Sequence, residues 1–358
     1  MTQLQRLQSS IKESSFDAML ISSSANQRYL SDFDYSDGYM LVSTDKAYLL
    51  TDPRYIESAR AAVNNFEIIL PPSLMSDSIL ELITQNGYKK IAIEESSMTC
   101  SSFETFKNKF KESCELISGA SAMLSKQRSV KLPYEIDRMQ AAQDITDKAF
   151  AHVLEFIKPS MTELDVALEL EFFMRRNGAD GIAFNTIAVS GSASSLPHGR
   201  PSNVQLREGL FTMDFGARYK GYCSDMTRTI AIGKLDEEMK KVYDTVLAAQ
   251  QNALEKMTVG MLCRDTDSLA RDVIKNAGYG EAFGHSLGHG VGIFVHEAPS
   301  LSQKADENAK LEAGNVVTVE PGIYLEGRFG CRIEDMVAIN ADGSVYNFTK
   351  SPKHLIEI

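Results

Sequence analysis

Short apolar segments alternate with segments of helical periodicity over roughly the first third of the chain. Strand-type apolar segments occupy residues 18–21, 47–50 and 91–93, and segments of helical character occupy 2–14, 56–63 and 76–84. Short strands separated by helices predict an α/β layer domain.

A polar stretch at 125–129 ends this pattern, and a new helix is predicted to begin at Pro133. Proline is favoured at the first helical position, and Glu135 follows it in the first turn. We therefore expect two domains, an amino-terminal α/β domain at residues 1–128 and a second domain at residues 129–358.

The second domain repeats one order of elements. A helix runs to Pro159, a second begins at Thr162 and ends at Asn177-Gly178, and strand-like segments follow at 182–189, 210–218 and 222–232. A long helix through Met239 and Leu247, a helix at about 265–277, and strands at about 315–324 and 331–339 then repeat this order. Two successive units of two helices and a hairpin predict an α+β fold with an internal duplication and an active site between its halves.

Composition narrows the class of protein. Apolar residues make up 43% of the 358 residues and charged residues 24%, which is ordinary for a globular protein. The formal net charge is −11, from 48 acidic and 37 basic residues, so we expect no nucleic-acid or membrane partner, because both require a basic face. Five scattered cysteines without a C-x-x-C pair, no signal-type amino terminus and no long apolar run predict a reduced, cytoplasmic protein.

Two aspartates lie in apolar strands on either side of a short turn. If the chain turns through Tyr219-Lys220, Asp214 and Asp225 are direct cross-strand partners. Like charges at opposed positions repel, and aspartate is disfavoured within strands. The pair is explained by a cation between the carboxylates, or by one carboxyl that keeps its proton at a raised pKa.

Two glutamates repeat the arrangement near the end of the chain. A hairpin centred on Gly327 places Glu320 opposite Glu334. Four buried carboxylates without cations would cost many kcal/mol. Two such hairpins in a duplicated layout therefore predict a site for two metal ions.

A glycine-rich segment, GHSLGHGVG at 284–292, lies between the two hairpins. Its glycines allow close backbone approach and place His289 as a neutral imidazole ligand. Four carboxylates and one imidazole suit two divalent ions, with Mn²⁺ as the first expectation and Co²⁺, Fe²⁺ or Zn²⁺ as alternatives. Paired metals can share a hydroxide and polarise a carbonyl, which is the chemistry of amide hydrolysis. His198, His285 and His296 are candidates for the proton donors that such a reaction needs.

The segments MDFG, SDMTRT, GHSLGHGVG, HEAP, VEPGIY and RIEDM resemble, in order and spacing, the pita-bread metallopeptidase family, which includes aminopeptidase P, prolidase and methionine aminopeptidase. The match runs from about residue 133 to 358. The front domain resembles the creatinase-type amino-terminal domain of aminopeptidase P and prolidase, which methionine aminopeptidases lack.

This resemblance implies a role for each candidate residue. Asp214 would chelate one metal, His289 and Glu320 the other, and Asp225 and Glu334 would bridge the two ions. Glu320 would also be the general base, while the three further histidines would contact the scissile carbonyl and its developing charge. Arg332 would orient a carboxylate or the substrate, unless it is only a structural partner of an acidic neighbour.

The implied activity is hydrolysis of an amino-terminal Xaa-Pro bond with release of the first residue. Prolidase activity on dipeptides is the alternative, and it depends on a group that pairs with the free carboxylate of a dipeptide. A creatinase-like hydrolase and a protein-binding module predict lost ligands, whereas all five ligands are intact. The expected partners are a peptide with proline at its second position and, in a homodimer, a second copy of the chain.

Overall fold

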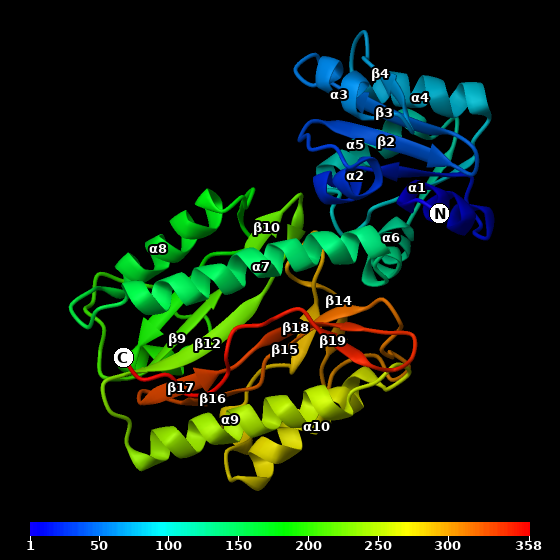
Figure 1. Cartoon of the computed structure of the whole chain (residues 1–358). Coiled ribbons are helices and arrows are strands. Elements are labelled where there is room, and N and C mark those ends of the chain that lie inside the picture. Colours follow the sequence, from blue (N-terminus) through cyan, green and yellow to red (C-terminus); the bar gives the residue numbers. More distant parts are fainter. The chain divides into compact units, whose positions relative to one another are not determined.

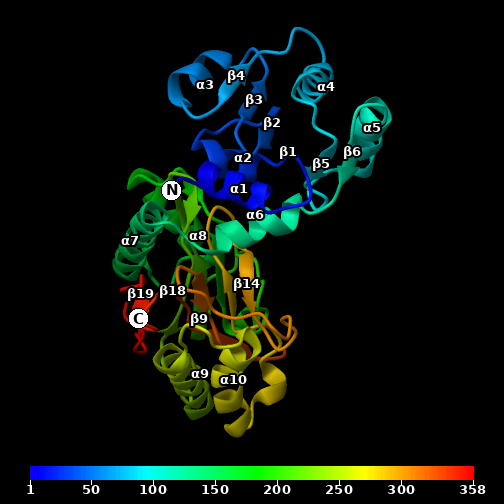
Figure 2. The ribbon, with the colours of Figure 1, turned by 90° about the vertical axis from the view of Figure 1, so that its right-hand side faces the viewer.

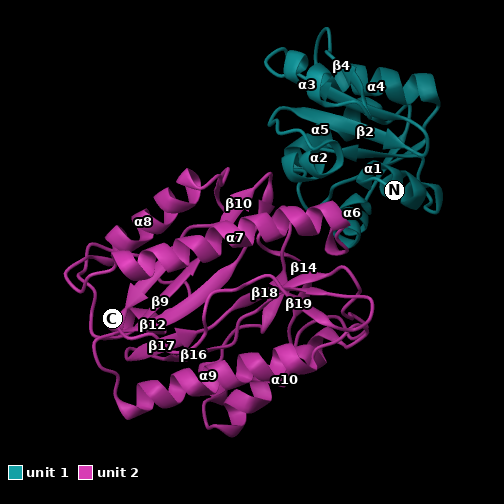
Figure 3. Ribbon diagram, viewed as in Figure 1, with its two compact units in different colours: residues 1–127 teal, residues 128–358 magenta.

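The computed structural model describes residues 1–358, which divide into two compact units, residues 1–127 and 128–358 (Figure 3). No helix combines the length and the apolar character that crossing a membrane requires. All five cysteines are free thiols, as the cysteine spacing predicted.

The first unit is a mixed six-stranded sheet with helices around it (Figure 1). Its strand order is β4-β3-β2-β1-β5-β6, with β1 antiparallel to β2 and parallel to β5. The helices are α1 (Gln3–Lys12), α2 (Ser24–Ser31), α3 (Ile56–Ala62), α4 (Met75–Asn86), α5 (Cys100–Phe110) and α6 (Ala120–Ser129). The strands are β1 (Ala18–Ile21), β2 (Gly38–Ser43), β3 (Ala47–Thr51), β4 (Glu67–Ile69), β5 (Lys90–Ile93) and β6 (Glu115–Ile117).

The predicted α/β layer is confirmed, with two differences in detail. The strands β2, β4 and β6 and the helices α2 and α5 were not predicted. The polar stretch at 125–129 is the end of α6, so the division between the units falls within a helix.

The second unit begins with two helices whose ends follow the sequence signals. The helix α7 (Pro133–Phe156) starts with proline, and the Glu135 carboxylate accepts the N–H of Leu132 at 2.8 Å. The helix α8 (Glu163–Arg176) starts after Thr162, which exchanges hydrogen bonds with Asp165 in a capping box.

The strands of the second unit form two related groups, each covered by a pair of helices. In Figure 1, α7 and α8 lie on one side of the strands, and α9 (Glu237–Lys256) and α10 (Cys263–Asn276) lie on the other; Figure 2 shows α9 and α10 side by side. Apolar side chains of α7 and α8 pack on β9 and β12, and those of α9 and α10 pack on β15 and β18. This arrangement is the duplicated α+β layout that the sequence predicted.

The first group contains β7 (Gly181–Ile182), β8 (Ile187–Ser190), η1 (Gly191–Ser195), β9 (Gly209–Phe215), β10 (Ala217–Tyr219), β11 (Tyr222–Cys223) and β12 (Met226–Ile232). The second contains η2 (Gly280–Ala282), β13 (Gly288–Gly290), β14 (Glu297–Leu301), β15 (Val316–Val319), β16 (Gly322–Leu325), β17 (Phe329–Arg332), β18 (Asp335–Ile339) and β19 (Val345–Asn347).

Candidate metal centre

The two aspartates lie beside a break in one long hairpin. Asp214 is the penultimate residue of β9, and Asp225 directly precedes β12. Asp214 faces Thr227 across the strands, so the predicted direct pairing with Asp225 is wrong. The turn uses Lys220 and Gly221, both at positive φ, instead of Tyr219 and Lys220. This moves the register by two residues, which keeps a side chain on the same face of the sheet.

The two glutamates lie at the matching break in the second half. Glu320 directly follows β15, and Glu334 directly precedes β18. The pairs on both sides, Val319 with Asp335 and Gly322 with Arg332, follow the predicted register centred on Gly327. Each half of the fold therefore delivers two carboxylates from an interruption between strands.

His289 lies in the middle of β13, between two strands that approach it closely. A Cβ atom at Gly288 would lie 2.0 Å from Thr318 O, and one at Gly290 would lie 2.1 Å from Ala298 O. Only glycine fits these two positions, as the glycine-rich segment predicted. The strand can therefore run against both neighbours and turn the His289 side chain toward the carboxylates.

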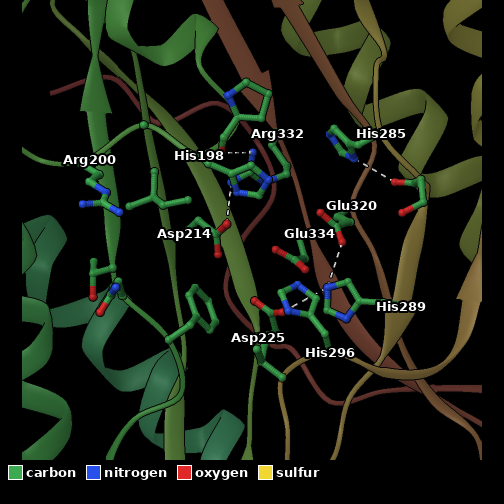
Figure 4. Close-up of a pocket in the computed structure, with 18 of the residues that line it drawn as sticks. His198, Arg200, Asp214, Asp225, His285, His289, His296, Glu320, Arg332 and Glu334 are labelled. Atoms are coloured by element: carbon green, nitrogen blue, oxygen red, sulfur yellow. Dashed lines mark hydrogen bonds and ion pairs between the residues drawn. The ribbon is translucent and has the colours of Figure 1, made fainter. Parts of the chain in front are cut away.

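One cavity of about 890 Å³ brings these side chains together (Figure 4). It is lined by all nine residues that the sequence singled out: His198, Asp214, Asp225, His285, His289, His296, Glu320, Arg332 and Glu334. Figure 4 shows Asp225, Glu334, Glu320 and His289 turned toward a common space.

Three of the carboxyl groups are not fully neutralised by the positive charges of the surrounding side chains. Burial, together with the charges of neighbouring carboxylates, raises the pKa of Asp225 and of Glu334 well above their usual values. Burial also raises the pKa of Asp214 against the opposing charge of Arg332. Asp214 Oδ1 and Asp225 Oδ1 are buried without a hydrogen-bond partner. Buried oxygens of this kind require a cation or a proton.

Glu320 and His289 form the exception. The His289 Nε2 atom lies 3.2 Å from Glu320 Oε1 and 3.7 Å from Asp225 Oδ2. Burial opposes both charges, but the hydrogen bond and mutual attraction lower the pKa of Glu320 to about 2 and raise that of His289 to about 9. A proton on His289 thus serves here as the positive charge that the carboxylates lack.

This donor set fits divalent metal ions. Ligand atoms of Asp225, His289 and Glu334 lie within 4.8 Å of one another. His289 Nδ1 lies 3.1 Å from Gly290 O and donates to it, so Nε2, which faces the carboxylates, is the candidate ligand atom. A metal-binding histidine is usually held by such a bond from its second nitrogen. A metal ion would replace the proton on Nε2 and satisfy the unpaired carboxylate oxygens.

Arg332 is committed to this site by four hydrogen bonds. It is 3% exposed and donates to Asp214 Oδ2 at 2.5 Å, Tyr324 Oη at 2.6 Å, Thr227 Oγ1 at 3.0 Å and Pro197 O at 3.3 Å. It therefore holds Asp214, and four of its five N–H groups are used within the site.

The three further histidines have different surroundings. His285 lies 2.8 Å from Ser286 O through Nδ1, which must donate, so Nε2 accepts the Tyr324 hydroxyl at 3.0 Å. Burial lowers the pKa values of His285 and His296, which keeps both rings neutral. His296 packs on His289 with ring centroids 4.3 Å apart, while His198 is exposed at the cavity.

A buried ion cluster anchors the loop that carries His296. The Glu297 carboxylate accepts the N–H of Phe294 at 3.0 Å and lies 3.5 Å from Lys131 Nζ and 3.3 Å from Arg128 Nε. The Lys131 and Glu297 side chains are 1% and 2% exposed. These ion pairs fix the loop against the residues that precede α7.

Sequence reasoning missed several neighbours of the candidate ligands. Thr227 donates to Glu334 at 2.6 Å, and Thr318 donates to Glu320 at 3.1 Å. Tyr324 lies in β16, beyond the break that contains Glu320, so the period-two spacing of a single strand does not connect the two residues. The two threonines stand in ordinary β-branched strand sequence, which gives no signal either.

Comparison with known proteins agrees with the fold and the donor set. Residues 137–341 match the metallopeptidase family M24, and residues 3–130 match the creatinase/prolidase N-terminal domain. The class defined by fold and site is a metal-dependent hydrolase with a pita-bread catalytic domain. The chain belongs to metallopeptidase family M24, in the group that carries the creatinase-type front domain.

Relatives match over the whole chain. An Xaa-Pro dipeptidase of Pyrococcus horikoshii is 37% identical over 96% of this chain and 95% of its own length. The solved structure of an Xaa-Pro dipeptidase from Bacillus anthracis has a TM-score of 0.94 and 40% identity, covering 99% of each chain. That of an X-Pro aminopeptidase from Thermotoga maritima has a TM-score of 0.90 and 37% identity, covering 98% of this chain and 100% of its own. The expected family and fold are confirmed.

Proposed function

We propose that this protein hydrolyses the peptide bond before proline at the second position of a peptide and releases the first residue. The observation that carries the proposal is the pair of strand breaks that bring four carboxylates and His289 into one cavity. The names of the relatives support the choice of an Xaa-Pro bond.

We assign two divalent ions to the five candidate ligands, with Mn²⁺ as the first choice. Asp214 would bind one ion, His289 and Glu320 the other, and Asp225 and Glu334 both. Bound metals of this kind activate water as a nucleophile and polarise the scissile carbonyl. The shortage of positive charge at Asp225 and Glu334 supports this assignment.

The chain supplies the proton transfers and the orientation of the ligands. Glu320 lies in the cavity beside the other candidate ligands and would accept a proton from the attacking water. Arg332 and Thr227 hold Asp214 and Glu334 by hydrogen bonds, which limits the movement of both carboxylates. His198 and His296 both line the cavity and would hydrogen-bond the carbonyl oxygen as charge develops. His285 can join them only if it exchanges its bond with Tyr324.

Activity on longer peptides and activity on dipeptides are both supported by relatives, one an X-Pro aminopeptidase and others Xaa-Pro dipeptidases. A panel of Ala-Pro, Ala-Pro-Ala and Met-Ala-Ala, assayed with Mn²⁺, separates them. Cleavage of Ala-Pro alone identifies a dipeptidase, and cleavage of Ala-Pro-Ala identifies an aminopeptidase. Cleavage of Met-Ala-Ala alone would contradict the proposal. The homodimer and the cytoplasmic location stay predictions, the first to be checked by light scattering.

A further inference from the structure

The cavity holds one cationic side chain that the metal centre does not use. Six acidic residues line it, namely Glu171, Asp214, Asp225, Glu297, Glu320 and Glu334, against two arginines, Arg200 and Arg332. Arg332 is buried and committed to Asp214, Tyr324 and Pro197 O. Arg200 is exposed, and its guanidinium makes no hydrogen bond or ion pair. It is therefore the available permanent positive charge facing this space.

The loop that carries Arg200 is fixed at both ends. The Gly199 N–H donates to Leu196 O at 3.0 Å, and Pro197 O accepts the Arg332 guanidinium. On the other side, the Ser202 hydroxyl donates at 2.9 Å to Glu163, which is 2% exposed and also holds Ser190. The backbone is thus held in place, while the long side chain of Arg200 remains free to meet a ligand.

Arg200 is also close to the residue assigned to the scissile bond. His198 stands two positions earlier, so the two Cα atoms are at most about 7 Å apart. Figure 4 shows both side chains at the cavity, with Arg200 farther from Glu320 and His289 than His198 is. A substrate whose carbonyl meets His198 would therefore place its next few atoms within reach of Arg200.

The chemistry of the two candidate substrates differs at that point. In an Xaa-Pro dipeptide the free carboxylate is two bonds from the scissile nitrogen, whereas a longer peptide has a neutral amide there. The two proposed metal ions would offset the four ligand carboxylates, and Glu297 is paired with Lys131, so Arg200 is the cationic side chain left to pair with a carboxylate that enters the cavity. The planar guanidinium of arginine binds a carboxylate through two parallel hydrogen bonds.

We propose that Arg200 binds the free carboxylate of an Xaa-Pro dipeptide and thereby makes the cavity accept dipeptides. The inference rests on the proposed Xaa-Pro peptidase function and adds the substrate class to it. Because the ion pair forms on binding and does not involve the atoms of the scissile bond, its loss should raise KM and leave kcat nearly unchanged.

The test compares Ala-Pro with Ala-prolinamide, which keeps the scissile bond and removes the carboxylate. We expect Arg200→Gln to raise KM for Ala-Pro by about tenfold, with kcat within about twofold, and to leave Ala-prolinamide unaffected. Arg200→Lys should recover part of the affinity, because it restores the charge without the fork. Arg176→Gln, at an exposed arginine of α8 that does not line the cavity, is the matched control and should behave as wild type.

The outcomes distinguish a failure of the role of Arg200 from a failure of the proposed Xaa-Pro peptidase function. Equal losses on both substrates, or no change on Ala-Pro, would overturn the role of Arg200. Wild-type cleavage of Ala-prolinamide and Ala-Pro-Ala but not Ala-Pro would also overturn it while leaving the Xaa-Pro function intact. A wild-type protein that cleaves none of them would overturn both. If circular dichroism shows that Arg200→Gln is unfolded, the folded Arg200→Lys variant decides, and an unchanged KM would then count against the proposal.

Discussion

Two neighbouring residues, Glu334 and Asp335, show how differently this protein treats buried carboxylates. Glu334 faces Asp225 and Glu320, and burial together with their charges raises its pKa well above the usual value. Asp335 accepts Arg228 at 2.8 Å and Lys353 at 2.6 Å, and despite burial these charges lower its pKa. The two side chains are 1% and 0% exposed, so burial alone does not distinguish them.

The difference is that Asp335 forms ion pairs with two cationic side chains, whereas Glu334 forms none. Arg228 also donates to the main-chain oxygens of Ser351 and Glu334, so the network around Asp335 is closed. The acidic cluster around Glu334 is open, with buried oxygens of Asp214 and Asp225 that no donor reaches. Breaking a closed network of buried ion pairs is costly, whereas an open cluster of buried carboxylates is a candidate binding site for a cation.

The largest expected effect is on catalysis within the open cluster. Glu320→Gln keeps the size of the side chain and removes the proton acceptor, so we expect kcat to fall by about a thousandfold or more. Steady-state assays on Ala-Pro-Ala with saturating Mn²⁺ measure it. Metal content and circular dichroism should be compared in parallel, and a rate near that of wild type would remove Glu320 from the mechanism.

The next effect is on stability within the closed network. Asp335→Asn removes the charge that pairs with Arg228 and Lys353 and leaves both cations without it, which should cost about 3 kcal/mol in the free energy of unfolding. Guanidinium chloride titration followed by circular dichroism measures this. Arg328→Gln, which breaks an exposed ion pair with Glu238, is the control and should change stability little.

The third effect is on metal affinity, which should depend on the carboxylates of the open cluster and not on Asp335. Asp225→Asn weakens a ligand that the proposed function places between both ions, and we expect metal affinity to fall by about a hundredfold or more. Elemental analysis after equilibrium dialysis against Mn²⁺ gives the number of ions per chain. Asp335→Asn should keep the wild-type metal content, and two ions retained by Asp225→Asn would contradict the bridging role.

The sequence predicted the features that are encoded locally and missed those that depend on contacts between distant segments. Apolar segments predicted β1 and β3 closely, and the proline and threonine signals located the starts of α7 and α8, because these features are encoded locally. The strand β14 and the helix that spans 120–129 depend on packing between distant segments, which periodicity does not contain.

The two hairpins show the limit at the site itself. The register at Gly327 was predictable because glycine adopts the positive φ of that turn. The register at the aspartates was not, because the turn places Lys220 at φ 47°, which few lysines adopt. Asp214 and Asp225 still point to the same face, because a register shift of two residues does not change the face of a strand. Arg200 lay outside every recognised motif, and the cavity was needed to find it.

The smallest effect is expected in the metal-free protein, where the sign of one substitution should reverse. Burial and the charge of Asp214 raise the pKa of Asp225 well above its usual 3.8. A carboxyl group with a raised folded-state pKa loses stabilising free energy as the pH rises from the unfolded value through the folded one. Asp225→Asn cannot ionise, so after treatment with EDTA the variant should be more stable than wild type at pH 7, by about 1 kcal/mol.

This advantage should shrink as the pH falls toward 4, because wild-type Asp225 then takes up its proton. Asp335 predicts the opposite trend, since a lowered pKa contributes stability above the unfolded value that is lost as the pH falls. Denaturant titrations of wild type and of each variant at pH 4 and pH 7, with and without Mn²⁺, give the free energy of unfolding under each condition. Excess Mn²⁺ should reverse the order at pH 7, because wild type binds the ions more tightly. A metal-free variant less stable than wild type at pH 7 would show that the acidic cluster is not short of positive charge, and the distinction between the two networks would then fail.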